Sequence, residues 1–409
     1  MTVIENKKLY LQMSNVLYIS YDGILEPLGY SQVWSYLSRL SNDRKFFLIS
    51  FEKKVDFKDT ISVHNMKDRC KKAGIIWIPL RYHKTPSILA TLYDILLGTI
   101  VGAFIVLRNK ISIVHARSYI PALMALFLKK IFRLKFIFDM RGLWADEKAD
   151  SGIWKKDGLV FKFVKGLEKY FLLNAEIVIS LTHKAVEEIK NFPYLKNTKV
   201  NYKVITTCAD LDIFSLRNKE SNNKPFTLGY VGSVSLWYAF EEVLLTFKLL
   251  LQIIPEAKLC IINKGEHELI NQSLMEAGLK KDNVNVVSSD HAGVSKLMND
   301  MDAGIFFIRP YYSKIASAPT KLGEFLGCGV PCLSNTGVGD MTRILEDNKV
   351  GVAIKDFEEI SLKKGLEELI AISKSEGIRY HCRSVSLDLF SLDVGVRSYE
   401  QVYASLEGK

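Results

Sequence analysis

The sequence predicts an α/β protein with two doubly wound domains in tandem, and three observations support this prediction. The chain has 409 residues, which is too long for one ordinary hydrophobic core. Short, near-continuous apolar runs alternate with longer segments of helical periodicity, a pattern typical of strands buried on both faces of a parallel sheet. A polar stretch near the middle of the chain interrupts the alternation, which then restarts.

Each apolar run is predicted to be a strand, and helices such as 240–254 fill the intervals. The strands expected in the first half are 15–20, 46–51, 75–80, 111–116, 135–140, 176–181 and 203–208. Those expected in the second half are 227–232, 258–263, 284–289, 303–308, 330–335 and 351–356. The predicted division is a first domain over 1–208, a linker over 209–225, a second domain over 226–388 and a terminal helix over 389–409.

One apolar segment, 87–107, is about long enough to span a bilayer. Asp94, Gly98 and Gly102 interrupt it, and strand–helix alternation continues on both sides. We therefore expect a buried crossover helix here and not a spanning one. Polar and acidic residues near the N-terminus lead us to expect no signal peptide.

The composition suits a soluble globular protein, with 48% hydrophobic and 24% charged residues. Six cysteines lie at positions without metal-ligand or redox spacing, so we expect buried free thiols in a reducing cytoplasm. No metal ion and no cofactor is expected. An NAD-dependent dehydrogenase is disfavoured because no G-x-G-x-x-G sequence follows the first strand.

Charge is distributed unevenly between the two halves. Residues 1–205 contain 33 Lys and Arg against 18 Asp and Glu, whereas residues 206–409 contain 22 against 27. A basic half can face an anionic membrane, a phosphorylated substrate or nucleic acid. Segments 127–136 and 152–173 mix basic with apolar residues, a composition that suits a membrane-surface patch. For residues 160–171 the favoured interpretation is an ordinary domain helix with its apolar face in the core. Nucleic-acid binding is not expected, because aromatic stacking platforms and known motifs are missing.

Polar groups follow the strands of the second half at the point where each strand ends. A helix is expected to begin near Pro319 and Thr320, with Lys321 in its first turn and Glu324 one turn later. Lys321 and Arg309 are cations suited to a diphosphate, and Glu324 is an acceptor suited to ribose hydroxyls. The helix N-terminus also favours an anion. These groups fit a nucleotide diphosphate, and a surface Lys321–Glu324 pair is the alternative.

The ordered set of several stretches resembles a family 4 glycosyltransferase of the GT-B fold. The likeness is carried by residues 21–40, 114–123, 138–147, 228–238 and 318–340 and by the terminal helix. It implies two facing Rossmann-like domains with a cleft between them, acceptor bound by the first domain and nucleotide sugar by the second. It also implies that the terminal helix packs back on the first domain, and that transfer retains anomeric configuration without a metal ion.

The places of polar residues at strand ends, taken together with this resemblance, lead us to expect roles for individual residues. Expected catalytic residues are His115, Arg309 and Lys321, with a structural role as the alternative for His115. Expected donor-binding residues are Gly23, Gly29, Gly232, Ser233, Asn263, Lys264, Ser317, Pro319, Thr320 and Glu324. Expected acceptor-binding residues are Asp22, Arg117, Asp139, Arg141, Trp144 and Asp146, with a structural Arg141–Asp146 pair as the alternative.

The chain departs from the family pattern at two places. Glu324 matches the second glutamate of the family's Glu-x7-Glu motif, but Ala316 occupies the position of the first. The family's usual Arg and Lys after the strand at 227–232 are also missing. The diphosphate is therefore expected to be held by Arg309, Lys321 and backbone amides of residues 317–320.

The expected activity is transfer of a sugar from a nucleotide-diphosphate sugar to a glycan or a lipid-diphosphate-linked acceptor. The setting would be synthesis of a cell-surface polysaccharide such as lipopolysaccharide, by a cytoplasmic enzyme peripheral to the membrane. Two alternatives are a nucleotide-sugar epimerase or hydrolase of the same fold, and an inactive protein that binds nucleotide sugars or membranes.

Overall fold

The computed structural model describes residues 14–42, 44–217 and 224–407. Contacts divide the chain into two units. Unit 1 comprises Met1–Asp139, Phe171–Val178 and Tyr399–Lys409, and unit 2 comprises Met140–Tyr170 and Ile179–Ser398. The expectation on a signal peptide concerns residues 1–20, of which 1–13 lie outside the described residues. Part of the expected linker, residues 218–223, also lies outside them.

The strands predicted from the sequence are all present in the described part of the chain, and every described register is parallel. The first sheet has the order β3-β2-β1-β4-β5-β6-β7 and the second β10-β9-β8-β11-β12-β13. The strands of the first sheet are β1 (Asn15–Ser20), β2 (Phe46–Glu52), β3 (Ile76–Arg81), β4 (Ile111–Arg117), β5 (Lys135–Asp139), β6 (Ile177–Ser180) and β7 (Tyr202–Val204). Those of the second are β8 (Thr227–Val231), β9 (Lys258–Ile262), β10 (Val284–Val287), β11 (Ala303–Ile305), β12 (Cys332–Asn335) and β13 (Gly351–Ile354).

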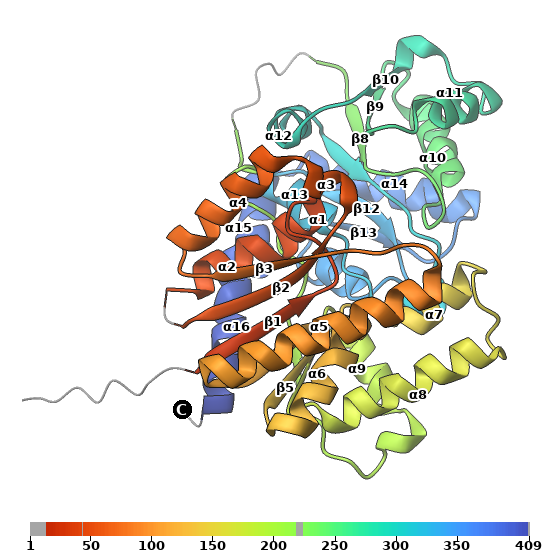
Figure 1. Ribbon diagram of the computed structural model, residues 1–409. Coiled ribbons are helices and arrows are strands. Elements are labelled where there is room, and N and C mark those ends of the chain that lie inside the picture. Colours follow the sequence, from red (N-terminus) through yellow and green to blue (C-terminus); the bar gives the residue numbers. More distant parts are fainter. Residues whose placement is uncertain (1–13, 43, 218–223, 408–409) are drawn as a thin grey trace, which may run out of the picture. The chain divides into compact units, whose positions relative to one another are not determined.

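Helices occupy the intervals between strands, as expected for doubly wound sheets (Figure 1). Up to β7 they are α1 (Pro27–Gly29), η1 (Tyr30–Trp34), α2 (Ser35–Leu40), α3 (Lys54–Lys58), α4 (Thr60–Lys72), α5 (Ser87–Asn109), α6 (Tyr119–Phe132), α7 (Trp144–Asp150), α8 (Leu159–Asn174), α9 (His183–Lys190) and η2 (Pro193–Leu195). After β8 they are α10 (Phe240–Ile253), α11 (His267–Glu276), η3 (Lys281–Asn283), α12 (His291–Asn299), η4 (Tyr312–Ala316), α13 (Thr320–Gly327), η5 (Arg343–Asp347), α14 (Glu359–Ser373), α15 (Ile378–Phe390) and α16 (Leu392–Glu407).

In unit 1, α5 and α6 cover one face of the sheet, and the end of α16 packs against buried residues of β2 and β4 (Figure 1). The Tyr403 hydroxyl lies 2.7 Å from His115 Nδ1, and the Tyr399 hydroxyl donates to Asp139 at 2.9 Å. The Arg44 guanidinium lies 4.6 Å from the Tyr403 ring centroid. Burial alone would be non-specific, so these polar contacts fix the position of this part of α16.

The segment predicted to be a buried crossover helix forms α5, but only one of its faces is buried. Gly98 and Gly102 permit close packing on α6, because an added Cβ would lie 2.6 Å from Met124 Sδ and 2.8 Å from Leu128 Cδ1. The opposite face carries large apolar side chains and is exposed. By length and composition alone, α5 could also cross a membrane. The expectation of a buried helix therefore holds for one face of α5 and is wrong for the other.

Helix α8 likewise divides the apolar residues of segment 152–173 between two environments. Val164 and Phe171 are buried, whereas Val160 and Phe163 are exposed. The interpretation as an ordinary domain helix therefore agrees with the burial of Val164 and Phe171 but not with the exposure of Val160 and Phe163.

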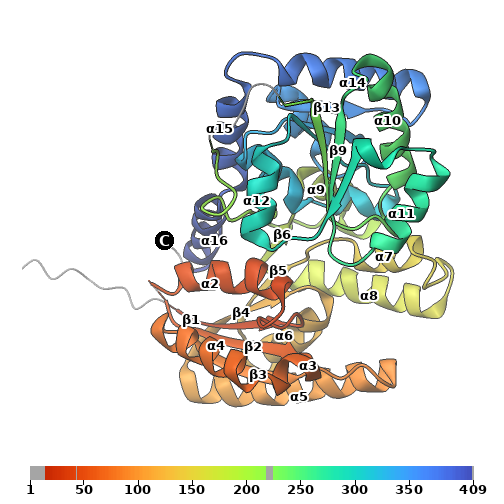
Figure 2. The same ribbon diagram turned by 90° about the horizontal axis from the view of Figure 1, so that it is seen from above.

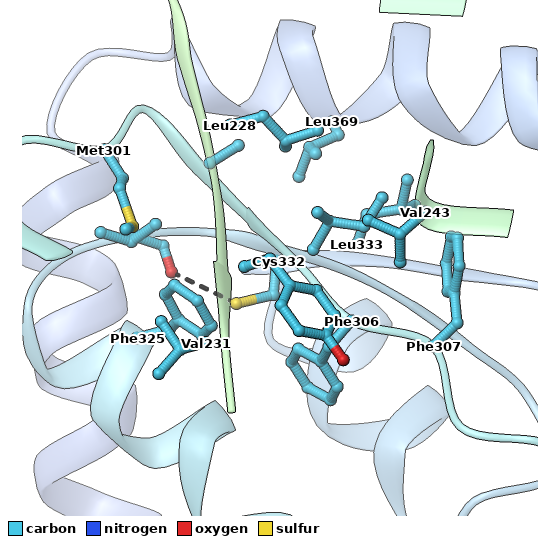
Figure 3. Packing of buried hydrophobic residues seen from close by; sticks show 14 of the residues in the cluster. Leu228, Val231, Val243, Met301, Phe306, Phe307, Phe325, Cys332, Leu333 and Leu369 are labelled. Atoms are coloured by element: carbon cyan, nitrogen blue, oxygen red, sulfur yellow. Dashed lines mark hydrogen bonds between the residues drawn. The ribbon is translucent and has the colours of Figure 1, made fainter. Parts of the chain in front are cut away.

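The core of unit 2 is built from the second sheet and the helices on its two faces. Figure 3 shows Leu228 and Val231 of β8, Val243 of α10, Phe325 of α13 and Leu333 of β12 among the residues of one buried cluster. The glycine at position 304 lets Phe325 approach β11, since an added Cβ would lie 2.9 Å from its ring. All six cysteines are free and buried, as expected.

Gly29→Ala tests the tight loop that follows β1. An added Cβ would lie 1.9 Å from the Gly23 carbonyl oxygen, a backbone atom that cannot move away alone. We expect the free energy of unfolding to fall by at least about 2 kcal/mol in urea denaturation. Gly166→Ala is the matched control: nothing lies within 4 Å of the added Cβ, and in α8 it should be neutral or stabilise by up to about 1 kcal/mol.

Candidate active site

The loop that follows β8 supplies the floor of the candidate site in unit 2. Gly232 has a φ of +111°, which favours glycine, and its N–H donates to the Ile262 carbonyl at 3.0 Å. A Cβ at this position would lie only 2.8 Å from Lys321 Nζ. The glycine therefore leaves space at the end of β8 for the lysine ammonium group.

Lys321 lies in the first turn of α13, and its side chain is 9% exposed. Its Nζ is 4.1 Å from the centroid of the Tyr238 ring and 5.3 Å from that of Tyr230. Among the described residues, Nζ has no hydrogen-bond partner. Burial lowers the lysine pKa to about 7, against the opposing effect of the Glu324 charge. A buried ammonium group without a partner is a suitable place for an anion.

Glu324 lies one turn further along α13, as predicted. Burial raises the pKa of its carboxyl to about 7, and the neighbouring charge of Lys321 acts in the opposite direction. The two side chains are near enough to influence each other electrostatically. Because Lys321 is buried, the alternative of a surface pair between these two residues is wrong.

Two backbone N–H groups around the start of α13 already have partners: that of Ser317 donates to the Lys314 carbonyl at 3.0 Å and that of Leu322 donates to the Pro319 carbonyl at 3.1 Å. Pro319 is the N-cap, and no side chain caps the first turn. The segment is fixed by its carbonyl groups, since the Thr182 hydroxyl donates to Ile315 at 2.7 Å and the Thr207 hydroxyl donates to Ala318 at 2.9 Å. The structure thus places predicted donor residues Ser317, Pro319 and Thr320 directly before the lysine. Amides at an uncapped helix start suit an anion.

Lys314 of η4 is a site residue that sequence reasoning missed. Its side chain is buried; Nζ lies 3.6 Å from the Trp237 ring centroid and 3.5 Å from Glu147 Oε1. Burial lowers its pKa, although Glu147 opposes the shift. Lys314 and Lys321 each stack on one of two consecutive aromatic residues after β8. The signal available in the sequence was that Lys314 precedes Lys321 by seven residues, with Ser317 and Pro319 between them.

Arg309 follows β11 as predicted, but its guanidinium group contacts α10. Nη2 lies 3.3 Å from Glu241 Oε2, and Nη1 lies 3.9 Å from Glu242 Oε1. Its backbone N–H donates to the Trp237 carbonyl at 2.8 Å. In this structure Arg309 therefore links the loop after β8 to the first turn of α10.

Glu266, also missed, organises two residues that were expected to bind the donor. It accepts hydrogen bonds from the Ser233 hydroxyl at 2.9 Å, the Val234 N–H at 3.0 Å and the Asn263 amide at 2.9 Å. Burial alone would raise its pKa, but these hydrogen bonds lower it to about 2. Ser233 and Asn263 thus stabilise the loop through Glu266, while Lys264 is exposed beside them.

In unit 1, the loop after β1 contains three predicted residues. Asp22 Oδ2 lies 3.4 Å from Nε of Arg117, which is itself buried. Gly23 and Gly29 pack on one another. Glu52, a fully buried residue that the sequence did not single out, accepts hydrogen bonds from the backbone N–H groups of Ile24 and Leu25. The loop is therefore held from beneath by a carboxylate.

His115 and Asp139 are both completely buried in unit 1. His115 Nε2 lies 3.6 Å from Asp139 Oδ2, and both residues contact tyrosines of α16. Side chains without exposed surface are not available to a bound sugar. This placement favours the structural alternative for His115 and assigns Asp139 to the same buried network.

The remaining predicted residues belong to unit 2, around α7. Asp146 is buried and accepts a hydrogen bond from Lys165 Nζ at 3.0 Å, so the described partner of Asp146 is Lys165. The Trp144 ring packs edge-on against Trp154 at 5.2 Å between centroids. Arg141, with a φ of +62°, forms the turn before α7. The structure thus leaves Trp144 and Arg141 as partly exposed groups and places Asp146 in an ion pair.

Within the described part of the chain, no group of three or more His, Cys, Asp or Glu side chains is placed to hold a metal ion. The candidate site is instead formed by two lysines, one carboxyl group, aromatic rings and backbone N–H groups.

Comparison with known proteins agrees with this chemistry. A family model described as glycosyl transferases group 1 matches residues 212–378, which include the whole lysine and glutamate arrangement. No curated protein matches the chain. The chain is a glycosyltransferase.

Solved structures show the fold of this glycosyltransferase. A sucrose-phosphate synthase from Thermosynechococcus elongatus is 13% identical, with a TM-score of 0.73 over 96% of this chain and 99% of that one. A glycosyltransferase from Rickettsia africae is 15% identical, with a TM-score of 0.69 over 96% and 98%. HepE from Anabaena, solved in complex with UDP, is 12% identical, with a TM-score of 0.65 over 96% and 100%. These matches establish the GT-B fold with its two Rossmann-like domains.

Lys321→Met tests the unpaired ammonium group. At about pH 6 we expect the free energy of unfolding of this variant to be about 2 kcal/mol higher than that of the unmodified chain. The variant is more stable because the substitution removes an uncompensated buried charge. Below pH 7 the lysine is charged in both the folded and the unfolded chain. As pH rises from about 7 towards 10.5, only the folded chain loses the proton, so the unmodified protein gains stability and the difference shrinks.

Denaturant titrations across this pH range measure the effect. Lys264→Met is the control, because Lys264 is exposed and its removal should leave stability unchanged. A Lys321→Met variant that is less stable at every pH would show that the ammonium group is already compensated in the folded chain.

Proposed function

We propose that this glycosyltransferase binds the diphosphate of a nucleotide-diphosphate sugar at Lys321 and transfers the sugar with retention of configuration, as a family 4 enzyme. The observation that carries the proposal is the buried Lys321 ammonium group without a hydrogen-bond partner, next to Gly232 and the uncapped start of α13. A diphosphate supplies the missing acceptors. HepE, which shares the fold, was solved with UDP and with UDP-glucose, which supports a nucleotide sugar as the donor.

Glu324 is the proposed acceptor for the ribose hydroxyl groups. It lies one turn beyond Lys321 on the same helix, so a nucleotide bound through its diphosphate at the helix start can place its ribose beside this carboxylate. Because the pKa of the Glu324 carboxyl is about 7, charged groups that bind beside it change the fraction of Glu324 that is ionised at neutral pH. Deprotonation of Glu324 favours hydrogen bonds from the two ribose hydroxyl groups.

Lys314 is proposed to add a second cation for the diphosphate, a role different from that of the family's first motif glutamate. Ala316 occupies that position, and Lys314 reaches the Trp237 ring from two residues earlier. Two buried lysines on adjacent aromatic rings provide positive charge where negative charge develops on the leaving diphosphate. Departure of that group needs this stabilisation, because no proton is transferred to it before the bond to the sugar breaks.

The acceptor hydroxyl attacks the anomeric carbon from the face that the diphosphate leaves. The new carbon–oxygen bond forms as the old one breaks, and the hydroxyl proton passes to the departing phosphate oxygen. Lysine charge and backbone N–H groups stabilise the leaving group, so this step uses neither a metal ion nor a cofactor. The proposed acceptor is a glycan or a lipid-diphosphate-linked sugar, in cytoplasmic synthesis of a cell-surface polysaccharide.

A thermal-shift panel of UDP-, GDP-, ADP- and CMP-sugars identifies the donor, because a ligand that binds the folded chain raises its melting temperature. We expect one base class to give a clear shift. Glu324→Gln should then weaken binding of that donor by about tenfold to hundredfold, since two hydrogen bonds to a charged acceptor are weakened. The exposed residue Glu256 provides the control variant, Glu256→Gln.

Three results would contradict the proposal. Unchanged donor affinity in Glu324→Gln would remove the assignment of the ribose site. Release of free sugar or formation of a 2-epimer without acceptor, as the main activity, would instead favour a hydrolase or epimerase. Donor binding without transfer to any glycan or lipid-linked acceptor would favour an inactive binding protein.

A further inference from the structure

The outward face of α5 is apolar along its whole length. Between Ile88 and Leu107 it spans about 30 Å at 1.5 Å per residue. Figure 2 shows α5 at the outer margin of unit 1, and two residues of the neighbouring helix α6 extend its exposed face. The apolar side chains of this face are Ile88, Leu89, Leu92, Tyr93, Leu96, Ile100, Phe104 and Leu107 of α5 with Phe127 and Ile131 of α6, all of them exposed.

The opposite face of α5 contains the small and polar residues. Asp94 is fully buried and accepts hydrogen bonds from the Tyr21 hydroxyl at 2.8 Å and the His83 N–H at 3.1 Å. Gly98 and Gly102 pack closely on α6. An amphipathic helix of a soluble protein normally presents its polar residues to water. Helix α5 instead exposes large apolar side chains on one face, while its inner face also contains the apolar residues Ile95, Ile105 and Val106. An exposed apolar surface of this extent marks an interaction site.

Within residues 81–135, the segment that forms this face, the exposed charges all have one sign, and the partly exposed Glu176 from outside the segment pairs with Lys129 of α6. Residues 81–135 contain nine Lys and Arg and a single acid, the buried Asp94. Exposed cations lie in the sequence at both ends of α5 and at the end of α6; they are Arg81, Lys84, Arg108, Lys110, Lys130 and Arg133. The Arg108 guanidinium lies 3.8 Å from the Phe104 ring centroid, at the border between the charged and apolar parts.

We propose that this α5–α6 face binds the surface of an anionic lipid bilayer, with α5 lying parallel to the membrane. The apolar side chains enter the boundary between head groups and acyl chains, and the cations contact lipid phosphate groups. Long Lys and Arg side chains can keep their charge at the head groups while their stems cover apolar surface. The proposal does not depend on the identity of the sugar donor.

The structure disfavours two other occupants of this face. To span the bilayer, α5 would have to leave α6 and carry Asp94 away from Tyr21 and His83 into the hydrocarbon, which is costly. A second copy of the chain packed on the same face would place exposed cations against identical cations, with no exposed acid in residues 81–135 to compensate.

Co-sedimentation with vesicles tests the proposal on the full chain. We expect binding to vesicles that contain about one-third phosphatidylglycerol, and weak binding to phosphatidylcholine alone, with release by salt. The double variant Leu96→Glu and Ile100→Glu should bind at least about tenfold less, because charge replaces apolar contacts. The control is Ile360→Glu with Met275→Glu, an equal change at two exposed apolar positions of unit 2, which should bind as the unmodified chain does.

Site-specific labelling locates the contact. All six native cysteines are buried, so a polarity-sensitive fluorophore can be attached selectively to a Leu96→Cys variant. Its emission should shift to shorter wavelength when anionic vesicles are added. The same label on Ile360→Cys should not respond.

Several outcomes would overturn the proposal. These are equal sedimentation of both double variants, an unresponsive label at position 96, and dimers in solution that Leu96→Glu converts to monomers. Retention in alkaline-washed membranes would indicate a spanning helix instead. Nucleotide-sugar binding should be the same in both double variants, so a failure here is distinguishable from a failure of the donor-site proposal.

Discussion

The arrangement of the site depends on one unfavourable contact, a buried ammonium group placed where no protein atom neutralises it fully. Gly232 leaves space for Lys321 at the end of β8, and aromatic rings, which attract cations weakly, surround the lysine Nζ. Folding carries this cost before any ligand arrives. The surrounding structure must therefore be stable enough to tolerate it, and the densely packed core of the second sheet, with Phe325 of α13 at its centre, supplies that stability.

Rigid support is the second requirement of such a site. Glu266 ties Ser233, Val234 and Asn263 together, so the loop that carries the aromatic rings is fixed to two strand ends. Carbonyl groups of Ile315 and Ala318 accept hydrogen bonds from threonines of unit 2, which fix the segment that leads into α13. The polar residues that the sequence suggested as ligands thus act partly as positioning residues, and the positive charge is concentrated on lysines.

The sequence was sufficient for the strands, because runs such as 15–20 and 258–263 can only be buried on both faces of a sheet. It also placed Lys321 and Glu324 correctly, since both follow from the start of one short helix. It could not reveal Lys314 or Glu266, whose roles depend on contacts with residues distant in the sequence. His115 shows the reverse problem: the end of a strand can be exposed or covered, and here Tyr403 of a helix nearly 300 residues later covers it.

Helix α5 shows why hydropathy alone could not predict which of its faces is buried. Apolar periodicity indicates which large apolar residues share one face of the helix. Asp94, Gly98 and Gly102 share the other face, and the sequence pattern does not indicate which of these two faces packs against the rest of the protein. Close packing on α6 requires the small residues, and Asp94 finds its partners only on the inner side. Both requirements turn the large apolar side chains outward. Water solvates such an apolar surface poorly. The packing of Asp94, Gly98 and Gly102 on the inner side therefore leaves an outer surface that favours contact with an apolar partner.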